Sequence, residues 1–310
     1  MSRRKRRGRP IDGILLLDKP LGVSSNQALQ QVKRLYQAAK AGHTGSLDPL
    51  ATGVLPICFG EATKFSSYLL DADKSYRATC CLGVRTNTGD GEGEVIEQCD
   101  PSHLTQADLD GVLAQFHGEI SQVPPMHSAV KKDGQPLYKL ARKGLEVERE
   151  AREVTIYALE QIAWQGAEWI LDVRCSKGTY IRTLVEDIGE ALGVGAYLTG
   201  LRRTHVAGLE GAMVPFEQLE AWMGEKAFAE MDAALLPVDQ ALLHFPALAL
   251  DADTSFYLRQ GQAVRVAGAP THGNLRLYDA SGSFLGLGCI DREGRVAPQR
   301  LRAQEVDPDA

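Results

Sequence analysis

One acidic side chain stands in a loop that is dense in turn-forming residues. Asp48 lies in the segment 42–50, which reads GHTGSLDPL, and Pro49 restricts the backbone on both sides of the bond that joins them. Such a loop can hold a carboxylate rigidly in a partly apolar pocket, where it can serve as a nucleophile or a base. The alternative is an aspartate that only caps a turn, and the local sequence alone favours it.

An arginine is available to hold such a carboxylate in its charged form. Arg182 follows the string SKGTY at 176–180, on a segment whose apolar residues recur at helical spacing. A buried carboxylate without a partner has a raised pKa and takes up a proton, whereas a guanidinium stabilises the charge with two hydrogen bonds. An ordinary surface arginine is the alternative.

Two tyrosines and a histidine offer flat surfaces on which an aromatic ligand can stack. Tyr76 and Tyr180 stand in polar strings, and His43 lies in the same loop as Asp48. Stacking of a nucleic-acid base on an aromatic side chain contributes roughly 1–3 kcal/mol. Half-buried core tyrosines are the more common arrangement, so these residues indicate a base-binding site only in combination with other features.

The charge distribution is compatible with a polyanionic partner, although the net charge of the chain is −6. Residues 1–40 carry ten Lys and Arg against two Asp and Glu, and residues 131–152 carry seven against four. Residues 210–256, by contrast, carry one against nine. Phosphate binding depends on where the cations cluster, so the two basic segments are compatible with RNA binding. A solvated basic tail explains them equally well.

Composition indicates an ordinary globular protein, since 44% of the 310 residues are hydrophobic and 24% are charged. No apolar run approaches the roughly 18 residues that a membrane span needs. The basic start of the chain is not followed by the apolar segment of a signal peptide, so we expect a cytoplasmic protein. The cysteines form no Cys-x-x-Cys pair and the histidines show no zinc spacing, so we expect reduced thiols and no metal site.

Apolar periodicity predicts strands and helices in alternation over the first 245 residues. The expected strands cover 11–17, 74–84, 154–164, 169–175 and 197–206. The expected helices cover the segment from Ser24 to Gly42, then 61–70, 105–117 and the segment from Gly178 onward. Residues 215–245 are expected to be helical and acidic.

The sequence changes in character after Pro246. A short helix at 251–260 precedes several short strands that are separated by glycine-rich turns, as in a small β-barrel. We therefore place a domain boundary near residue 246. The expected division is a basic tail at 1–10, a main domain at 11–245 and a second domain at 246–310.

The loop around Asp48 and several further blocks resemble the TruB family of pseudouridine synthases. The fifteen residues GHTGSLDPLATGVLP at 42–56 look like the signature of this family. The match extends to LLDKP at 16–20, GEATK at 60–64, KSY at 74–76, SKGTYIR at 176–182 and LRR at 201–203. These blocks follow one another along most of residues 11–206. A match to a series of blocks is far more specific than a match to a lone short motif.

The resemblance implies a fold of the α/β (α+β) class. The catalytic domain is expected to hold a mixed, largely antiparallel sheet, and residues 246–310 a small PUA-like β-barrel that binds RNA. The segment 123–152 matches the mobile thumb of the family, which closes on the tRNA arm. A peripheral helix with solvated charges is the alternative for the basic part of this segment.

The resemblance also implies roles for individual side chains. Asp48 is expected to be the nucleophilic or otherwise essential carboxylate, Arg182 its ion-pair partner and Tyr76 a residue that contacts the base. The further residues expected to line the RNA or base site are His43, Tyr180 and Leu201. The cations expected to contact the RNA are Lys19, Lys64, Lys131, Lys132, Arg142 and Arg202.

The implied activity is the isomerisation of uridine 55, in the T-loop of tRNA, to pseudouridine. The enzyme would need no cofactor and no metal, and it would act as a monomer without an obligatory protein partner. A guide-RNA-dependent synthase subunit is one alternative, which the short chain and the lack of long charged tails disfavour. A non-catalytic factor that binds or folds tRNA is another.

Overall fold

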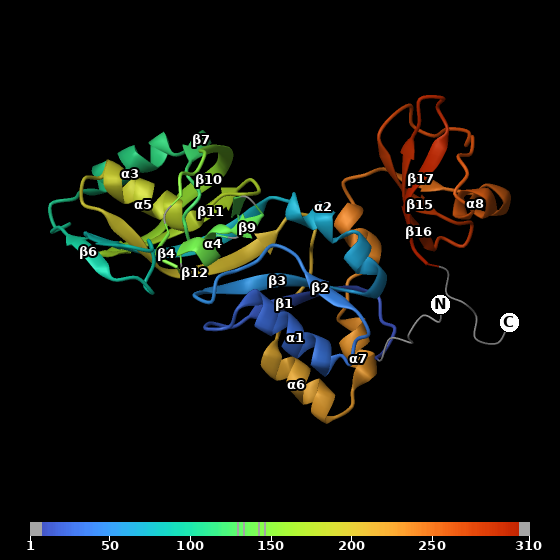
Figure 1. The fold of residues 1–310 in the computed structure, drawn as a ribbon, viewed down its shortest axis with the longest axis horizontal. Helices are drawn as coiled ribbons and strands as arrows, with labels where there is room; N and C mark the ends of the chain where they lie inside the picture. The colour runs from blue at the N-terminus through green and yellow to red at the C-terminus, as the bar shows by residue number, and fades with distance from the viewer. Residues whose placement is uncertain (1–7, 129, 133, 142, 146, 304–310) are drawn as a thin grey trace.

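A mixed sheet of nine strands forms the body of the chain (Figure 1). The computed structural model describes residues 8–303 except 129, 133, 142 and 146. The strands of the sheet are β1 (Gly13–Lys19), β2 (Ala41–His43), β3 (Ala51–Phe59), β4 (Lys74–Leu82), β7 (Gly118–Gln122), β10 (Arg152–Gln165), β11 (Glu168–Cys175), β12 (Ala196–Val206) and β13 (Val214–Pro215).

The strand pairing confirms the predicted mixed, largely antiparallel sheet. The order is β13-β1-β3-β12-β4-β11-β10-β7, and β2 also pairs with β3. Only β1–β13 and β3–β12 are parallel among these described pairs. The expected hairpin is present as β10 and β11, which turn at Gly166 with a φ of 58°.

Helices cover the two halves of this sheet separately. The half around β1 and β3 packs against α1 (Ser25–Leu35), α6 (Phe216–Gly224) and α7 (Phe228–Ala233). The half around β4, β10 and β11 packs against α3 (Gln106–Gln115) and α5 (Ile181–Ala191). The strands that lie between the two cores, β3, β12 and β4, therefore form the centre of the molecule.

Short elements connect these layers. They are η1 (Gly60–Lys64), α2 (Ser66–Leu70), β5 (Val84–Thr86), β6 (Val95–Gln98), β8 (Lys131–Lys132), β9 (Gln135–Pro136), α4 (Leu137–Ala141) and η2 (Val238–Leu242). Within the described part of the chain, no helix is long and apolar enough to cross a membrane.

Local sequence explains where α1 begins, but the predicted end of this helix at Gly42 is wrong. Ser24 and Gln27 form a capping box, and Ala28, Leu29 and Val32 bury one face. The helix ends at Leu35 because the chain turns at Gln37, which has a φ of 49°. The predicted helix 61–70 is likewise divided, into η1 and α2, at Phe65.

The residues after Pro246 form a separate four-stranded sheet with one helix. Its elements are β14 (Ala247–Ala249), α8 (Ala252–Arg259), β15 (Asn274–Tyr278), β16 (Phe284–Ile290) and β17 (Val296–Leu301). The predicted strand at 264–266 provides only an isolated bridge from Val264 to Val296. The described residues therefore form an open sheet, and the expected closed barrel is not seen among them.

A close backbone approach at Gly53 joins the two halves of the main sheet. One edge of β3 pairs with β12 at residues 51–53 and with β2 at residues 57–59. Gly53 has a φ of 94°, and a Cβ built on it would lie 2.1 Å from the carbonyl oxygen of Arg203. Only glycine fits this position, because both the conformation and the space exclude a side chain.

We expect Gly53→Ala to lower the free energy of unfolding by at least about 2 kcal/mol, because the left-handed conformation and the backbone contact both oppose the added methyl group. Urea unfolding measures the loss. Gly208→Ala is the matched control, since Gly208 has a φ of 80° but no atom within 4 Å of an added Cβ. Equal losses in the two variants would contradict the close approach.

Candidate active site

The loop that carries Asp48 is held by hydrogen bonds from the Ser25 side chain, at the start of helix α1, and from the backbone of Gly22. Ser25 Oγ accepts a hydrogen bond from Leu47 N at 2.7 Å and donates one to Leu47 O at 2.9 Å. Gly22 N donates to Pro49 O at 2.8 Å. These bonds hold the backbone on both sides of Asp48, while the Asp48 side chain remains 58% exposed.

The Asp48 carboxylate forms an ion pair with Arg182, from the first turn of α5. The Arg182 guanidinium donates to Asp48 Oδ2, and its side chain is only 9% exposed. The same guanidinium contacts two further acceptors from the loop after β5. Its Nε lies 3.2 Å from Asp90 Oδ2, and one Nη donates to Thr88 O at 3.3 Å.

Asp90 is a member of this network that the sequence analysis did not identify. Its side chain is 6% exposed and accepts hydrogen bonds from Thr88 Oγ1 at 2.7 Å and Glu92 N at 3.1 Å. The local sequence of this acidic loop does not distinguish Asp90 from its neighbours. Its importance comes from the fold, which places the loop against α5, more than 90 residues further along the chain.

A second buried arginine supports the site from below. Arg203 is 1% exposed, and it donates to Val54 O and to Gly45 O, each at 2.7 Å. It therefore links β3 to the start of the loop that carries Asp48. Arg203 is also the cross-strand partner of Tyr76, and its guanidinium lies close to the Tyr76 hydroxyl group. Burial raises the pKa of Tyr76, and the positive charge of Arg203 partly opposes this effect.

Two adjoining pockets open on either side of Asp48. The first has a volume of about 390 Å³, and its walls include Tyr76, Tyr180 and Leu201. The second, of about 600 Å³, includes His43. The fold thus brings together the six side chains for which a catalytic or base-binding role was predicted: His43, Asp48, Tyr76, Tyr180, Arg182 and Leu201.

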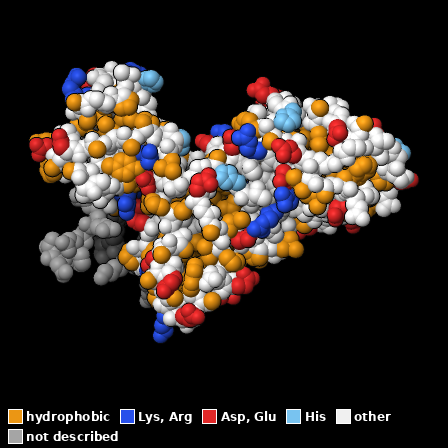
Figure 2. All heavy atoms as spheres, turned by 180° about the vertical axis from the view of Figure 1, so that it is seen from behind, with side chains coloured by type: hydrophobic (Ala, Val, Ile, Leu, Met, Phe, Trp, Pro, Cys, Tyr) orange, Lys and Arg blue, Asp and Glu red, His pale blue; other side chains and the backbone are white. Residues whose placement is uncertain are grey.

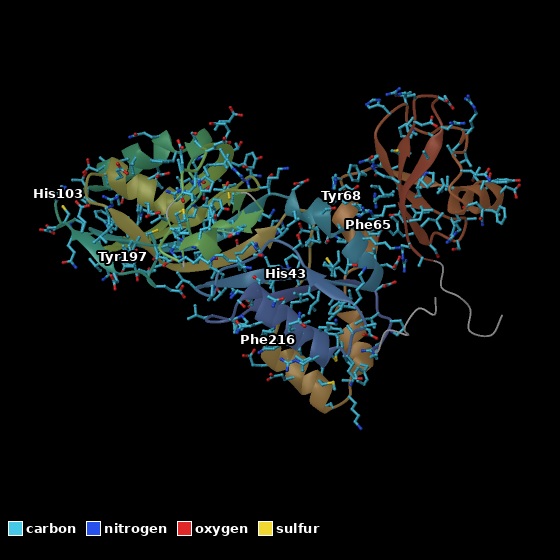
Figure 3. The ribbon with its side chains drawn as sticks, in the orientation of Figure 1. His43, Phe65, Tyr68, His103, Tyr197 and Phe216 are labelled. Atoms are coloured by element: carbon cyan, nitrogen blue, oxygen red, sulfur yellow. The ribbon has the colours of Figure 1, made fainter. Side chains whose placement is uncertain are left out.

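His43 lies near the centre of the molecule, on β2 (Figure 3). Burial lowers the pKa of His43, and the neighbouring charge of Arg203 acts in the same direction. The imidazole is therefore neutral at pH 7, and its buried Nδ1 has no hydrogen-bond partner among the described residues. A neutral ring of this kind is suited to stacking and to hydrogen bonding rather than to binding a phosphate.

Of the cations predicted to contact RNA, the structure describes the side chains of Lys19, Lys64 and Arg202, and none of these three lines either pocket. Lys19 is fully buried, and its ammonium donates to Pro20 O at 3.0 Å and Val23 O at 2.5 Å. Burial lowers the pKa of Lys19 to about 8, with Asp48 opposing the shift. Because this ammonium faces backbone carbonyl groups in the interior, the structure is inconsistent with a phosphate contact by Lys19.

The other described cations of the set are engaged in protein contacts. Arg202 makes a two-pronged ion pair with Asp18, at 2.9 and 2.8 Å, and Lys64 donates to Glu61 at 2.6 Å. On the face shown in Figure 2, positive and negative side chains lie next to one another. Lys131 and Lys132 form β8, but their side chains are not described, and Arg142 lies outside the described residues.

Glu186 places a partly buried carboxyl group against the loop that carries Asp90. It lies one helical turn after Arg182 on α5, and a Cβ on Gly89 would come within 2.4 Å of Glu186 Cδ. Burial raises the pKa of Glu186 from 4.5 to about 7, and Arg182 partly opposes this shift. Between these two pH values the folded protein therefore binds more protons than the unfolded chain.

We expect the stability of the wild type to fall relative to that of Glu186→Gln as the pH rises from 4.5 to 7, because ionisation of Glu186 is easier in the unfolded chain. Chemical unfolding at several pH values measures the difference. Glu220→Gln, which alters an exposed carboxylate on α6, should show no comparable trend. A difference between Glu186→Gln and wild type that is constant with pH would contradict this burial effect.

Three family models match consecutive parts of the chain. The TruB family pseudouridylate synthase N-terminal domain matches residues 33–181. The tRNA pseudouridylate synthase B C-terminal domain matches residues 182–243, and the C-terminal domain of pseudouridine synthase II TruB matches residues 246–301. Together these models cover the site and the C-terminal sheet.

Full-length relatives and solved structures agree with these matches. A tRNA pseudouridine synthase B of Coxiella burnetii is 55% identical over 94% of this chain and 95% of its own length. One from Yersinia pestis is 52% identical over 99% of this chain and 97% of its own. Among solved structures, the Cbf5–Nop10–Gar1 complex contains a chain that is 25% identical, with a TM-score of 0.71 and coverage of 94% of this chain and 84% of that one. The fold, the signature loop and the relatives agree, and the chain belongs to the TruB family of pseudouridine synthases.

Proposed function

We propose that this protein isomerises uridine 55 in the T-loop of tRNA to pseudouridine, with Asp48 as the essential carboxylate. The observation that carries the proposal is the ion pair between Asp48 and the buried Arg182, at the mouth of a pocket that is lined by Tyr76 and Leu201. Relatives that are 52–55% identical over nearly the whole chain bear the name tRNA pseudouridine synthase B.

The reaction breaks the N1–C1′ bond of the uridine, turns the uracil and joins its C5 to C1′. The proton on C5 is lost and N1 gains one, so substrate and product are isomers. Because no electrons and no other groups are exchanged, the reaction requires neither a redox cofactor nor an energy donor. The protein must supply only binding, orientation, a carboxylate and proton transfer.

The target base must leave its RNA loop to reach Asp48. Flipping a base out of a stack costs a few kcal/mol. Stacking on an aromatic ring contributes roughly 1–3 kcal/mol per base and can offset this cost. We assign this role to Tyr76 in the first pocket, and we assign His43 in the second pocket to the nucleotides that flank the target. The volume of the first pocket, about 390 Å³, is in the range of small-ligand sites.

Three chemical routes are open to Asp48 once the base is bound. The carboxylate can attack uracil C6, attack C1′ of the ribose, or remove the 2′ proton. All three need the charged form of Asp48 and a fixed direction of approach. The Arg182 guanidinium supplies both, because it is anchored by Asp90 and Thr88 and has no freedom to follow a moving partner.

A proton must also be taken from C5, and Tyr76 is the candidate side chain beside the base. Burial raises the pKa of Tyr76, so its phenol carries its own proton in the resting site. Transfer from C5 therefore requires either an exchange through this hydroxyl group or a water molecule. The neighbouring guanidinium of Arg203 favours one orientation of the hydroxyl group.

We further propose that the protein acts alone, as a cytoplasmic monomer. Residues 11–245 form the catalytic domain in this proposal, with a thumb at 123–152 that closes on the tRNA arm. Residues 246–310 form a PUA-like unit that binds RNA. Pseudouridine formed by the purified protein in the absence of any guide RNA would support this reading, and activity only with added guide RNA and protein partners would contradict it.

We expect Asp48→Asn to lower single-turnover pseudouridine formation in T-arm RNA by about 10⁴-fold or more, because the variant keeps the shape of the side chain but loses its charge. The dissociation constant for the same RNA should change little. Asp100→Asn, at an exposed position outside the site, should behave as the wild type. An Asp48→Asn protein that loses RNA binding and turnover together would point to a structural role for Asp48.

We expect Asp90→Asn to lower the rate of the chemical step by about 100-fold, because a displacement of Arg182 by a fraction of an ångström misdirects Asp48. The KM for RNA should change much less than kcat. Asp172→Asn is the control, since it removes an exposed partner of Arg77 that lies outside both pockets. Wild-type kcat in Asp90→Asn would show that Asp48 alone is enough to orient Arg182.

A further inference from the structure

Six residues are common to the walls of both pockets and form the ridge between them. They are Ser46, Leu47, Asp48, His127, Ser128 and Arg182. Two members, His127 and Ser128, come from the segment that follows β7, far from the others in sequence. This segment therefore completes the ridge on which Asp48 stands.

The start of this segment is connected by hydrogen bonds to the residue that precedes α5. Gln122, the last residue of β7, is 2% exposed. Its side chain accepts a hydrogen bond from Tyr180 N at 3.1 Å and donates one to Tyr180 O at 3.4 Å. These bonds connect the start of the segment to the residue that precedes Ile181 and Arg182. The position of Ser128 relative to Arg182 is thus set by the fold of both elements.

Ser128 carries a buried hydroxyl group whose hydrogen-bonding capacity is not fully used by the protein. The residue is 5% exposed, and its buried Oγ makes no hydrogen bond of normal geometry to any described residue. The Tyr180 hydroxyl lies close enough to form a weak hydrogen bond with it, and both side chains line the first pocket. Buried hydroxyl groups without a hydrogen bond of normal geometry are destabilising and therefore rare in folded proteins. A group of this kind on the wall of a binding pocket is suited to a partner that arrives with the ligand.

The place of Ser128 on the ridge indicates which part of the substrate it meets. If the uracil occupies the pocket lined by Tyr76 and Leu201, its glycosidic bond must lie at Asp48. Every route for Asp48 acts beside this bond, at C6 of the uracil or at C1′ or C2′ of the ribose. The ridge residues then face the sugar and its phosphates rather than the edge of the base. We infer that the Ser128 hydroxyl group hydrogen-bonds a sugar–phosphate oxygen of the target nucleotide and so positions its ribose over Asp48. This inference rests on the proposed function.

A binding cycle on the full-length chain tests the inference without interference from catalysis. In the Asp48→Asn background, dissociation constants are measured with and without Ser128→Ala for three T-arm RNAs. One RNA is unmodified, one has 2′-deoxyuridine at the target, and one has a neutral methylphosphonate on the 5′ side of the target. We expect Ser128→Ala to raise the dissociation constant for the unmodified RNA about 3- to 10-fold, which is the range for the loss of one hydrogen bond. We expect this loss to disappear with one of the two modified RNAs, which identifies the oxygen.

Ser121→Ala is the matched control, because Ser121 is an exposed serine on β7 that lines neither pocket. It should leave all three dissociation constants unchanged. Equal effects of Ser128→Ala on all three RNAs, or no effect on any, would overturn the inference and assign the Ser128 hydroxyl group to a water molecule. The wild-type protein is assayed in parallel on unmodified RNA. Absence of pseudouridine in the wild-type assay would refute the proposed function itself. If the wild type is active but Ser128→Ala affects the three RNAs equally or not at all, only this inference is refuted.

Discussion

The site depends on the ion pairs that the buried guanidinium of Arg182 makes with Asp48 and Asp90. The transfer of this guanidinium from water costs several kcal/mol, and only well-placed acceptors can repay that cost. They come from two loops that are distant in sequence, with Asp90 and Thr88 on one side and Asp48 on the other. The two carboxylates differ in their environment, since Asp90 is 6% exposed and Asp48 is 58% exposed. Asp90 therefore serves as the internal anchor, and Asp48 remains accessible to a substrate.

Arg203 is a second buried arginine that holds a loop in place, in the sheet next to the site. Between residues 53 and 57 the edge of β3 is covered by neither β12 nor β2, and a carbonyl group there would lack a partner. Arg203 donates to one of these carbonyl groups, at Val54, and Thr44 N donates to another, at Pro56. The Asp48 loop leaves the sheet through this interruption. The gap in strand pairing, the glycine at position 53 and the buried arginine are thus parts of one arrangement that aims the loop at α5.

The C-terminal sheet is attached to the main domain through a shared apolar core and several polar contacts. Phe284 of β16 packs against Phe65, with ring centroids 5.6 Å apart, and Figure 3 shows Phe65 on the side of the main domain that faces this sheet. Arg302 pairs with Asp12 at 3.0 Å, and Lys64 donates to Leu301 O at 2.9 Å. Lys64, expected as an RNA contact, thus also joins the two domains.

The sequence by itself determined the elements whose patterns are local and the identity of the chemistry. The capping box at Ser24, the period of α5 and the hairpin at Gly166 each depend on residues a few positions apart, so their elements were predictable. Element ends were less predictable, as at Gln37, where the chain leaves the helical direction with a φ of 49°. The resemblance of the Asp48 loop to the TruB family indicated the reaction, although the local sequence around Asp48 by itself favoured an aspartate that only caps a turn.

Only the tertiary structure decided which charged groups work together. Asp90 acts through Arg182, which lies 92 positions away, and Arg203 acts through Val54, which lies 149 positions away. No local pattern distinguishes Asp90 or Arg203 from surface residues. Lys19 is the opposite case. The sequence motif predicted that it contacts RNA, but in the fold its ammonium is buried against backbone carbonyl groups. Burial and charge pairing are properties of the folded chain, because they depend on which strands are adjacent. The sequence therefore predicted Asp48 and Arg182 as a pair, whereas the anchor that orients this pair became visible only in the fold.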